Sequence, residues 1–467
     1  MKVLFAASEA APFAKVGGLA DVIGSLPVAL AQRGVETAVI LPKYKVIDEK
    51  YRGSFLGSTE VSLGWRRQYA GLFALEYRGV KIFFVDNEYY FGSDSIYGYM
   101  EGEAEKYAFF SLAVLALLPL SGFMPDILHC NDWQTGLLPV LLKQRNSPIK
   151  TVMTIHNLQY QGTFGQQVFK DLLGFSDDMF TTDRLEFYGG ASFLKGGLLY
   201  ADKLTTVSPT YREETLTPEY GRQMEGVLAC RAKDYTGILN GLDEEDYNPA
   251  NDGLIPFAYS RPQGKAKNKA ALQRELGLKE EDVPLIALVS RLYNQKGLSL
   301  IREKLHELLF SQKFQLAVLG TGEPEYERFF SDIARWYSGR AAVHIGYDNA
   351  LAHRIYAGSD LFLMPSRFEP CGLSQLIAMR YGTLPIVRRT GGLNDTVRDI
   401  GDGGWGFCFN GYDACQMADA VCRGIACYRD AAAWSSAQKR AMEQDFSWKK
   451  SAEEYEKIYK QLCGGEF

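Results

Sequence analysis

Short apolar runs recur at intervals along most of the chain and limit the folds that it can adopt. Each run ends near Gly, Pro, Ser or Asn and is followed by a longer stretch of helical character. This alternation predicts parallel βαβ units, and therefore an α/β fold with doubly wound sheets. In such sheets ligands bind beyond the carboxyl ends of the strands. The predicted strands are residues 3–7, 37–41, 82–85, 127–129, 150–155, 203–207 and 236–239, then 285–290, 315–319, 342–345, 361–365 and 384–387.

This alternation is interrupted once, in a stretch of N-G, N-P, I-P and R-P-Q-G turns with a lysine-rich patch. Such punctuation is typical of a connection between domains. A length of 467 residues is enough for two large domains. We therefore predict a Rossmann-like domain at residues 1–240, a connection and hinge at 241–284, a second Rossmann-like domain at 285–447, and a C-terminal helix at 448–467.

The charge balance and the cysteine content limit which classes of binding partner and which cellular compartment we expect. Lys and Arg number 51 against 56 Asp and Glu, a net charge of −5 that lacks the basic excess of a nucleic-acid binder. The eight cysteines form no C-x-x-C pair, which predicts a reducing, cytoplasmic environment and no structural zinc. Glu9 interrupts the first apolar run too early for a secretory signal. The apolar stretch 107–118 is broken by Pro119 and Gly122, which favours a buried core helix over a membrane span.

A glycine-rich loop follows the first predicted strand, in the segment K-V-G-G-L-A-D-V that begins at Lys15. The glycines permit close backbone approach, the start of the next helix supplies unpaired N–H groups, and Lys15 adds positive charge. These properties suit an anion. A plain strand-to-helix turn explains the same glycines equally well.

The second half repeats this arrangement with two cations, Arg291 and Lys296, in the loop after its first strand. Two cations in that position fit a diphosphate, although surface cations are commonly only solvated. The later segment G-T-G-E-P lacks the third glycine of a dinucleotide fingerprint, and the chain contains no G-x-x-x-x-G-K-[ST] loop. These absences weigh against hydride transfer and against P-loop phosphoryl transfer.

The segment P-S-R-F-E-P-C-G-L-S-Q, residues 365–375, runs from an apolar strand through a loop into a helix expected to begin near Gly372. Glu369 has two interpretations. It is a helix-cap anion, or its carboxylate accepts hydrogen bonds from ligand hydroxyls while the Gly372 and Leu373 amides hold a phosphate.

Two histidines, His129 and His156, lie at the ends of predicted strands beside Asn, Asp or aromatic residues. Singly, each is as readily structural as functional. Together they favour a polar cleft that holds sugar hydroxyls against Trp133 or Tyr160. No histidine pair shows metal-ligand spacing, and the other three histidines receive no role.

These motifs taken in order resemble the bacterial glycogen synthase and plant starch synthase family. The resemblance rests on K-x-G-G-L-x-D, H-N-L-x-Y-Q-G, R-L-x-x-Q-K-G, S-R-F-E-P-C-G-L and R-x-T-G-G-L-x-D-T-V, and it covers nearly the whole chain. It implies the GT-B architecture, two Rossmann-like domains facing a deep cleft, with a C-terminal helix that crosses back to the first domain. It also implies transfer of glucose from ADP-glucose to the non-reducing end of an α-1,4-glucan such as glycogen, with retention of configuration.

The resemblance assigns roles to individual residues. Lys15 and Gly18 would approach the distal phosphate, and Arg291 and Lys296 would neutralise the diphosphate as charge develops on it. Glu369 would hold the 3- and 4-hydroxyls of the transferred glucose, and His156 would lie by its 6-hydroxyl. Further contacts would come from Asp21, Asn157 and Asn240 as polar groups, Asp132 and Trp133 toward glucose and acceptor, Tyr347 against adenine, and Cys371, Gly372, Leu373 and Ser374 around the phosphates.

One position departs from the family pattern. The family commonly has H-x-H-D-W, whereas this chain reads H-C-N-D-W with Asn131 in place of the second histidine. Asn131 keeps a hydrogen-bond donor and loses titratability, which puts a proton role at that position in doubt.

The resemblance implies no essential metal and no cofactor, with ADP-glucose and the glucan as partners, while the charge balance and the broken apolar stretch predict neither a nucleic-acid partner nor a membrane partner. It also implies closure about the hinge, because Lys15 and His156 belong to one domain and Arg291, Lys296 and Glu369 to the other. Two alternatives remain open. One is another retaining GT-B transferase that uses UDP-glucose or a small acceptor, and the other is a catalytically silent glucan-binding protein. A phosphorylase that uses pyridoxal phosphate is disfavoured by the shorter length of this chain. Sequence does not indicate the oligomeric state.

Overall fold

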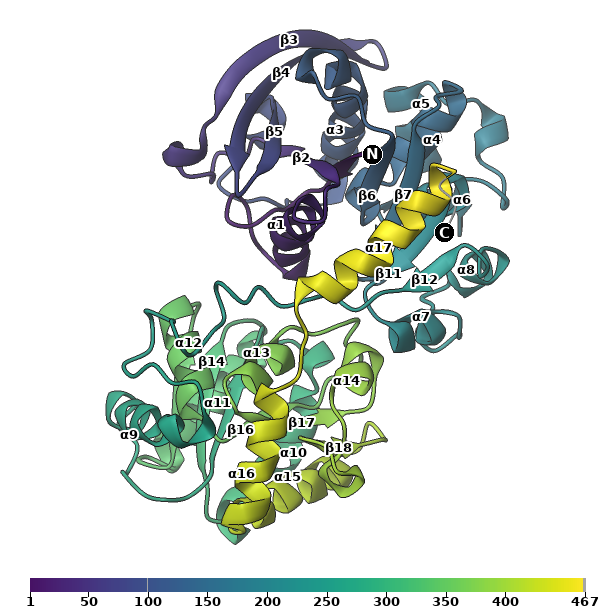
Figure 1. Cartoon of the computed structure of the whole chain (residues 1–467). Helices are drawn as coiled ribbons and strands as arrows, with labels where there is room; N and C mark the ends of the chain where they lie inside the picture. The colour runs from purple at the N-terminus through teal and green to yellow at the C-terminus, as the bar shows by residue number, and fades with distance from the viewer. Residues whose placement is uncertain (99, 465–467) are drawn as a thin grey trace. The chain divides into compact units, whose positions relative to one another are not determined.

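The computed structural model describes residues 1–98 and 100–464 and divides into two compact units. Unit 1 comprises Met1–Gly241 together with the C-terminal segment that begins at Trp448, and unit 2 comprises Leu242–Ser447. Figure 1 labels many of the elements of both units. Each unit is an α/β domain built on a mainly parallel sheet, as the alternating apolar runs predict.

Unit 1 contains a nine-stranded sheet whose buried strands run parallel. All seven strands predicted in the first half of the chain lie in it. In spatial order its strands are β12 (Tyr235–Gly237), β11 (Lys203–Thr206), β7 (Lys150–Ile155), β6 (Ile127–Asn131), β1 (Lys2–Ala6), β2 (Glu36–Pro42), β5 (Val80–Asp86), β4 (Arg66–Tyr77) and β3 (Ser54–Leu63).

The last two strands of this sheet are antiparallel and were not predicted. β3 and β4 pair along a long hairpin, and β4 also pairs antiparallel with β5. Most residues of β3 are exposed or half-buried, so this edge strand lacks the continuous apolar run of a buried parallel strand. A small antiparallel sheet, also unpredicted, joins β8 (Thr163–Phe164), β10 (Gly190–Ser192) and β9 (Glu186–Phe187).

The helices of unit 1 include α3 (Met100–Ser121), which contains the apolar stretch 107–118. Within the described residues it is the one helix whose length and composition would allow it to cross a membrane, over Gly102–Ser121, and 67% of the most apolar 18 residues of this segment are buried in the protein. This burial agrees with the predicted core helix. The other helices are α1 (Gly18–Ala31), α2 (Glu88–Phe91), α4 (Leu137–Gln144), α5 (Gln166–Leu173), α6 (Phe193–Tyr200), α7 (Pro209–Thr215), α8 (Glu225–Cys230) and α17 (Trp448–Leu462).

The C-terminal helix α17 packs on unit 1 against α1 (Figure 1). Arg33, just after α1, donates to Glu453 at 3.0 Å and to Glu456 at 2.8 Å. The buried face of α17 carries the apolar side chains Ala452, Tyr455 and Ile458, at the spacing of one face of a helix.

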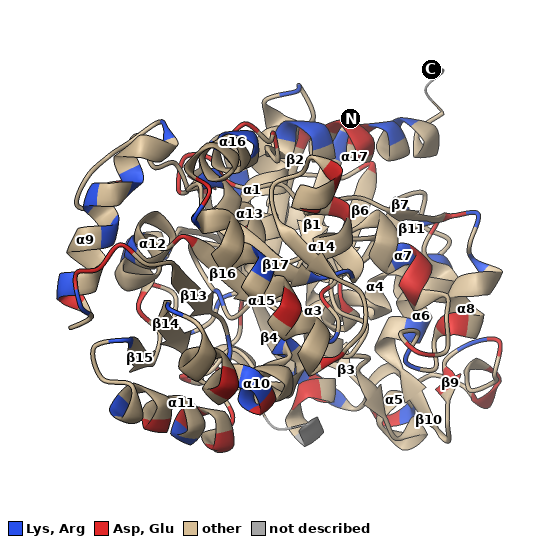
Figure 2. Ribbon diagram, turned by 90° about the horizontal axis from the view of Figure 1, so that it is seen from below, with Lys and Arg blue, Asp and Glu red and all other residues tan. Residues whose placement is uncertain are grey.

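Unit 2 contains a six-stranded sheet in which every pair is parallel. In spatial order its strands are β15 (Ala341–Ile345), β14 (Gln315–Gly320), β13 (Leu285–Val289), β16 (Leu361–Met364), β17 (Leu384–Arg388) and β18 (Phe407–Phe409), of which only β18 was not predicted. Its helices are α9 (Lys265–Glu275), α10 (Leu298–Ser311), α11 (Pro324–Trp336), α12 (Asn349–Gly358), α13 (Ser374–Arg380), α14 (Gly391–Thr396), α15 (Ala414–Tyr428) and α16 (Ala431–Met442). Acidic and basic residues are interspersed along helices such as α11 and α17 (Figure 2).

The segment expected to connect the domains, residues 241–284, is structured and belongs almost entirely to unit 2. Its helix α9 packs on α12. Lys265, in the lysine-rich patch, is only 4% exposed, and its Nζ contacts the carbonyl oxygens of Tyr356 and Tyr381 at 3.1 and 2.7 Å. A lysine that satisfies helix-terminal carbonyls can be buried, and composition alone does not reveal this.

Candidate active site

With the exception of Asn240, the predicted polar groups of unit 1 lie at the carboxyl ends of β1, β6 and β7, which are neighbours in the sheet. The glycine-rich loop follows β1, Asp132 and Trp133 follow β6, and His156 and Asn157 follow β7. Neighbouring parallel strands bring their carboxyl ends to one edge. The structure therefore brings these side chains together, although they are far apart in sequence.

The glycine-rich loop leads into α1, which begins at Gly18 with Gly17 at the N-cap. No side chain caps this helix start. A Cβ added at Gly17 would meet no atom within 4 Å, so the space beside the loop is open. Lys15 is exposed and its Nζ lies 2.5 Å from Asp21 Oδ1. An open helix start with a cation beside it suits an anionic group.

Glu9 holds this loop in place and was missed by the sequence analysis. Its side chain is buried, and Oε2 accepts hydrogen bonds from the Val16 and Gly17 amides at 2.6 and 2.9 Å. Oε1 accepts a hydrogen bond from the Tyr97 hydroxyl. In the sequence, Glu9 is visible as an acidic residue just beyond a predicted strand, where it indicates only that the apolar run is too short for a secretory signal peptide.

Asp132 links the ends of β6 and β7. Its Oδ1 accepts from the His156 amide at 2.7 Å and from the Asn157 amide at 3.4 Å. Its backbone has φ 57°, in the left-handed region that non-glycine residues rarely adopt. Burial raises the pKa of Asp132 to about 7, against the opposing effect of the two amide hydrogen bonds.

His156 is oriented by Asn131, the residue that departs from the family pattern. His156 Nε2 lies 2.9 Å from Asn131 Oδ1. Asn131 Nδ2 donates to the carbonyl oxygens of Ala6 and His129. Oδ1 is thus the acceptor and His156 Nε2 the donor, which leaves Nδ1 as an acceptor. Burial lowers the pKa of His156 to about 3, so the ring is neutral at physiological pH.

His129 does not line a cleft, and that interpretation is wrong. Its ring is 1% exposed, with Nδ1 2.6 Å from the Tyr459 hydroxyl on α17 and Nε2 2.5 Å from Thr154 Oγ1. Both ring nitrogens are therefore used inside unit 1. His129 helps to fasten α17 to the sheet.

Trp133 and Asn240 have different environments. Trp133 packs against Tyr107, Phe164 and Phe193, with ring centroids 5.1, 5.7 and 6.0 Å away.

Asn240 follows β12 and is 7% exposed, and its Oδ1 is buried without a hydrogen-bond partner. A buried acceptor of this kind is costly and is consistent with a partner group that binds there.

In unit 2 the loops after the neighbouring strands β13 and β16 meet. Lys296 Nζ donates to Glu369 Oε2 at 2.6 Å, and Ser366 Oγ donates to the same oxygen at 3.0 Å. Glu369 is 6% exposed. Gly297 has φ 75°, and a Cβ there would lie 2.0 Å from the Pro365 carbonyl oxygen, so only glycine permits this approach.

Glu369 is not the cap of the following helix. That helix, α13, begins at Ser374 rather than near Gly372, with Leu373 at the N-cap and no side-chain cap. Gly372 adopts φ 75° in the turn before it, and Cys371 is buried there. The Glu369 carboxylate instead faces Lys296 and Ser366.

Two of the predicted residues of unit 2, Arg291 and Tyr347, are exposed. Arg291 follows β13, with its guanidinium 5.6 Å from the centroid of the Tyr293 ring. Tyr347 follows β15 at the edge of the sheet and is 81% exposed. Both side chains are accessible to a ligand. Among the residues described, no group of three or more His, Cys, Asp or Glu is placed to hold a metal ion.

Family models match both units. A model of the starch synthase catalytic domain matches residues 2–230, and a model of glycosyl transferases group 1 matches residues 283–426. A glycogen synthase of Geobacillus thermodenitrificans is 49% identical over 476 residues, which cover 99% of this chain and 98% of the relative. A glycogen synthase of Bacillus subtilis is 48% identical over 477 residues, with the same coverage.

Solved structures agree with these matches. The catalytic domain of starch synthase IV from Arabidopsis thaliana, bound to ADP and acarbose, has a TM-score of 0.92 and 34% identity, with 99% of each chain covered. A sucrose-phosphate synthase from Thermosynechococcus elongatus has a TM-score of 0.65 and 19% identity over 99% of each chain, which supports the fold alone. The chain has the GT-B fold and belongs to the glycogen and starch synthase family of glucosyltransferases.

Proposed function

We propose that this protein transfers glucose from ADP-glucose to the non-reducing end of an α-1,4-glucan, with retention of configuration. The observation that carries the proposal is the buried Glu369 carboxylate, held by Lys296 and Ser366 rather than by a helix start. The names of the relatives and the ADP and acarbose bound to the Arabidopsis starch synthase support the same substrates. No cofactor or essential metal is part of the proposal.

The donor diphosphate would be bound by three cations, Lys15, Arg291 and Lys296. The helix start at Gly18 and the backbone of Cys371, Gly372, Leu373 and Ser374 would add N–H groups. These groups matter most in the transition state, when negative charge grows on the leaving ADP. Asp21, Asn157 and Asn240 would supply polar contacts, and Tyr347 would stack on the adenine.

The transferred glucose would be positioned through its hydroxyls. Glu369, buried and acceptor-only when ionised, would hold the 3- and 4-hydroxyls. Neutral His156 would accept from the 6-hydroxyl through Nδ1, because Nε2 is occupied by Asn131. Asp132 and Trp133 would contact glucose and the incoming glucan.

The chemistry needs no covalent intermediate on the protein. The acceptor 4-hydroxyl oxygen forms the new bond to the anomeric carbon on the face from which the phosphate leaves. The bond from that carbon to the phosphate oxygen breaks, and the departing phosphate takes the hydroxyl proton. The contribution of the protein is positioning and charge stabilisation, with His156 neutral and not a base.

The proposal is tested by incorporation of labelled glucose into glycogen, with ADP-glucose and UDP-glucose compared in the presence of a chelator. Transfer from ADP-glucose with the chelator present is the expected result. If glucose were transferred only from UDP-glucose, the donor would be assigned as UDP-glucose instead of ADP-glucose. Glycogen binding without transfer from either donor would favour a silent glucan-binding protein.

Because the proposed residues come from both units, we also propose that the units close during turnover. Small-angle scattering with and without ADP-glucose measures this directly. A smaller radius of gyration with the donor is expected, and an unchanged radius would remove closure from the mechanism.

A further inference from the structure

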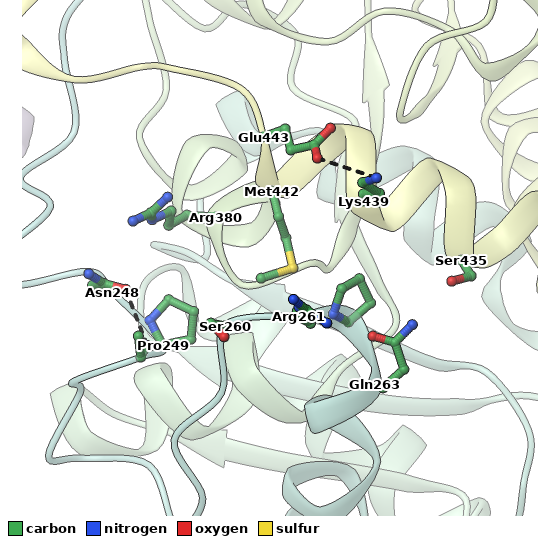
Figure 3. Close-up of a pocket in the computed structure, with 12 residues that line it drawn as sticks. Asn248, Pro249, Ser260, Arg261, Gln263, Arg380, Ser435, Lys439, Met442 and Glu443 are labelled. Atoms are coloured by element: carbon green, nitrogen blue, oxygen red, sulfur yellow. Dashed lines mark hydrogen bonds and ion pairs between the residues drawn. The ribbon is translucent and has the colours of Figure 1, made fainter.

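Unit 2 contains a cavity of about 810 Å³ that none of the proposed chemistry uses (Figure 3). Its walls come from the segment before α9, from the end of α13 and from α16. The volume falls in the range of sites for small organic ligands and exceeds what a single inorganic ion needs. The lining residues are Asn248, Pro249, Ala250, Ser260, Arg261, Pro262, Gln263, Arg380, Ser435, Lys439, Met442 and Glu443.

The charge of this cavity is opposite to that of the chain. Three of its charged residues are the cations Arg261, Arg380 and Lys439, and one is the carboxylate Glu443. The whole chain carries a net charge of −5. The side chains of Ser260, Ser435, Asn248 and Gln263 add neutral polar groups, and no aromatic residue lines the walls. The lining therefore favours an anion that also carries polar groups.

The cations of the cavity are only weakly neutralised from within. Arg380 Nε is buried without a hydrogen-bond partner, and the Glu244 carboxylate lies 3.9 Å from the other end of the guanidinium. Lys439 lies 3.8 Å from Glu443, and both side chains are largely exposed, so this ion pair contributes little. Arg261 is exposed. Donors of this kind, above all two guanidinium groups, match the oxygens of a phosphate.

We propose that this cavity binds a small phosphate ester of a sugar. The phosphate would bind the exposed Arg261, with Arg380 and Lys439 as further cations of the lining, and the sugar hydroxyls would bind the neutral polar side chains. A neutral glucan is a poor fit, because it leaves the cations without a partner and finds no aromatic ring to pack on. The proposal is independent of the donor and acceptor assigned above.

The cavity also lies where the chain enters and leaves unit 2. Asn248 to Gln263 follow closely after the entry at Leu242, and Lys439 to Glu443 precede the exit after Ser447. The chain segments that flank these two stretches are already joined, because the Leu242 amide donates to the Phe446 carbonyl oxygen at 2.7 Å. A bound phosphate ester would add a second link between them. Slower backbone hydrogen exchange is therefore expected in both stretches.

The test uses the full chain, with fructose 6-phosphate, inorganic phosphate and maltose as probes. Binding is measured by calorimetry, and its location by hydrogen exchange. Fructose 6-phosphate is expected to bind and to protect residues 248–263 and 435–443, inorganic phosphate to bind more weakly at the same place, and maltose to leave both stretches unprotected. Arg261→Gln should weaken fructose 6-phosphate binding about tenfold or more, the loss expected for an arginine bound to phosphate.

Arg274→Gln is the matched control, because Arg274 is an exposed arginine on α9 that pairs with Glu280 outside the cavity. It should bind fructose 6-phosphate like the native chain. Arg380→Gln is a second variant, and it should also weaken fructose 6-phosphate binding. Circular dichroism checks that Arg380→Gln folds, and if it does not, the result of Arg261→Gln alone decides the test. The proposal is overturned if fructose 6-phosphate does not bind, if it protects only residues 15–21 and 291–297, or if Arg261→Gln retains native affinity.

Discussion

The two units place polar groups at the carboxyl ends of their strands, but they hold these groups in different ways. In unit 1 the groups beyond β6 and β7 are fixed by hydrogen bonds, and His156 among them is uncharged, whereas Lys15 in the glycine-rich loop is the cation of this unit. The Asp132 carboxylate accepts from two amides, and the pKa of His156 is lowered to about 3. In unit 2 the central groups are an ion pair, Lys296 with Glu369, and the neighbouring Arg291 is exposed.

This difference indicates that the two units have different main roles in catalysis. Neutral, rigidly held groups orient a sugar without the cost of desolvating a charge, whereas cations are needed where a diphosphate leaves. Unit 1 would therefore mainly position the substrates, and unit 2 would mainly stabilise charge. Substitutions in the two units should then differ in size and in kind.

The largest effect is expected from Glu369→Ala. Loss of the buried acceptor for the glucose hydroxyls should lower kcat by about 10²- to 10³-fold, in the range of other lost transition-state contacts. Steady-state rates with ADP-glucose and glycogen measure it, and circular dichroism checks the fold. Glu325→Ala, which removes an exposed carboxylate of α11 paired with Arg302, is the control and should be near native. Near-native activity of Glu369→Ala would refute the proposed role.

The next effect is expected from Lys296→Gln, which should lower kcat/KM for ADP-glucose about 10²-fold through loss of charge at the diphosphate. Because Lys296 contacts Glu369, the double variant with Glu369→Ala should lose less than the product of the single losses. Lys304→Gln, on α10 and paired with Glu307, is the control. Multiplicative losses would show that the two side chains act separately.

A smaller effect is expected in unit 1 from Glu9→Gln. A glutamine offers one acceptor oxygen where the carboxylate serves the Val16 and Gly17 amides and the Tyr97 hydroxyl. The glycine-rich loop should become less ordered, and kcat/KM should fall about tenfold, as expected when a positioning contact is lost. Tyr97→Phe keeps both loop amides bonded and should lose less. Equal losses in the two variants would place the effect outside the loop.

The smallest effect concerns stability and depends on pH. The pKa of Asp132 is raised from 3.8 to about 7 in the folded protein, so between these values the folded state binds more protons than the unfolded state. The protonated Asp132 carboxyl therefore contributes to the stability of the folded state below pH 4, and this contribution is lost as pH rises through 7 and the buried carboxyl ionises. The Tm of Asp132→Asn relative to the native protein should therefore rise between pH 4 and 7. Asp94→Asn, at an exposed carboxylate, is the control. A constant difference in Tm would contradict the raised pKa.

Several elements were predictable because their signal is local. The parallel strands are continuous apolar runs, and the loops after them carry Lys15, His156, Lys296 and Glu369. The hairpin of β3 and β4 was missed because its strands are partly exposed and their pairing is set by the neighbouring β5. Glu9 was missed because the amides that it binds are seven and eight residues further along the chain.

The alternation of strands and helices, the family and the residue types beyond each strand could be predicted from the amino-acid sequence, since the hydrophobic period and the order of the motifs are properties of the chain. The fold was needed to establish that His129 fastens α17, that Lys265 is buried, and that Glu369 contacts Lys296 instead of capping a helix. These outcomes depend on which strands are neighbours and on which hydrogen-bond partners burial leaves for each polar group. Neither is encoded by residues adjacent in sequence.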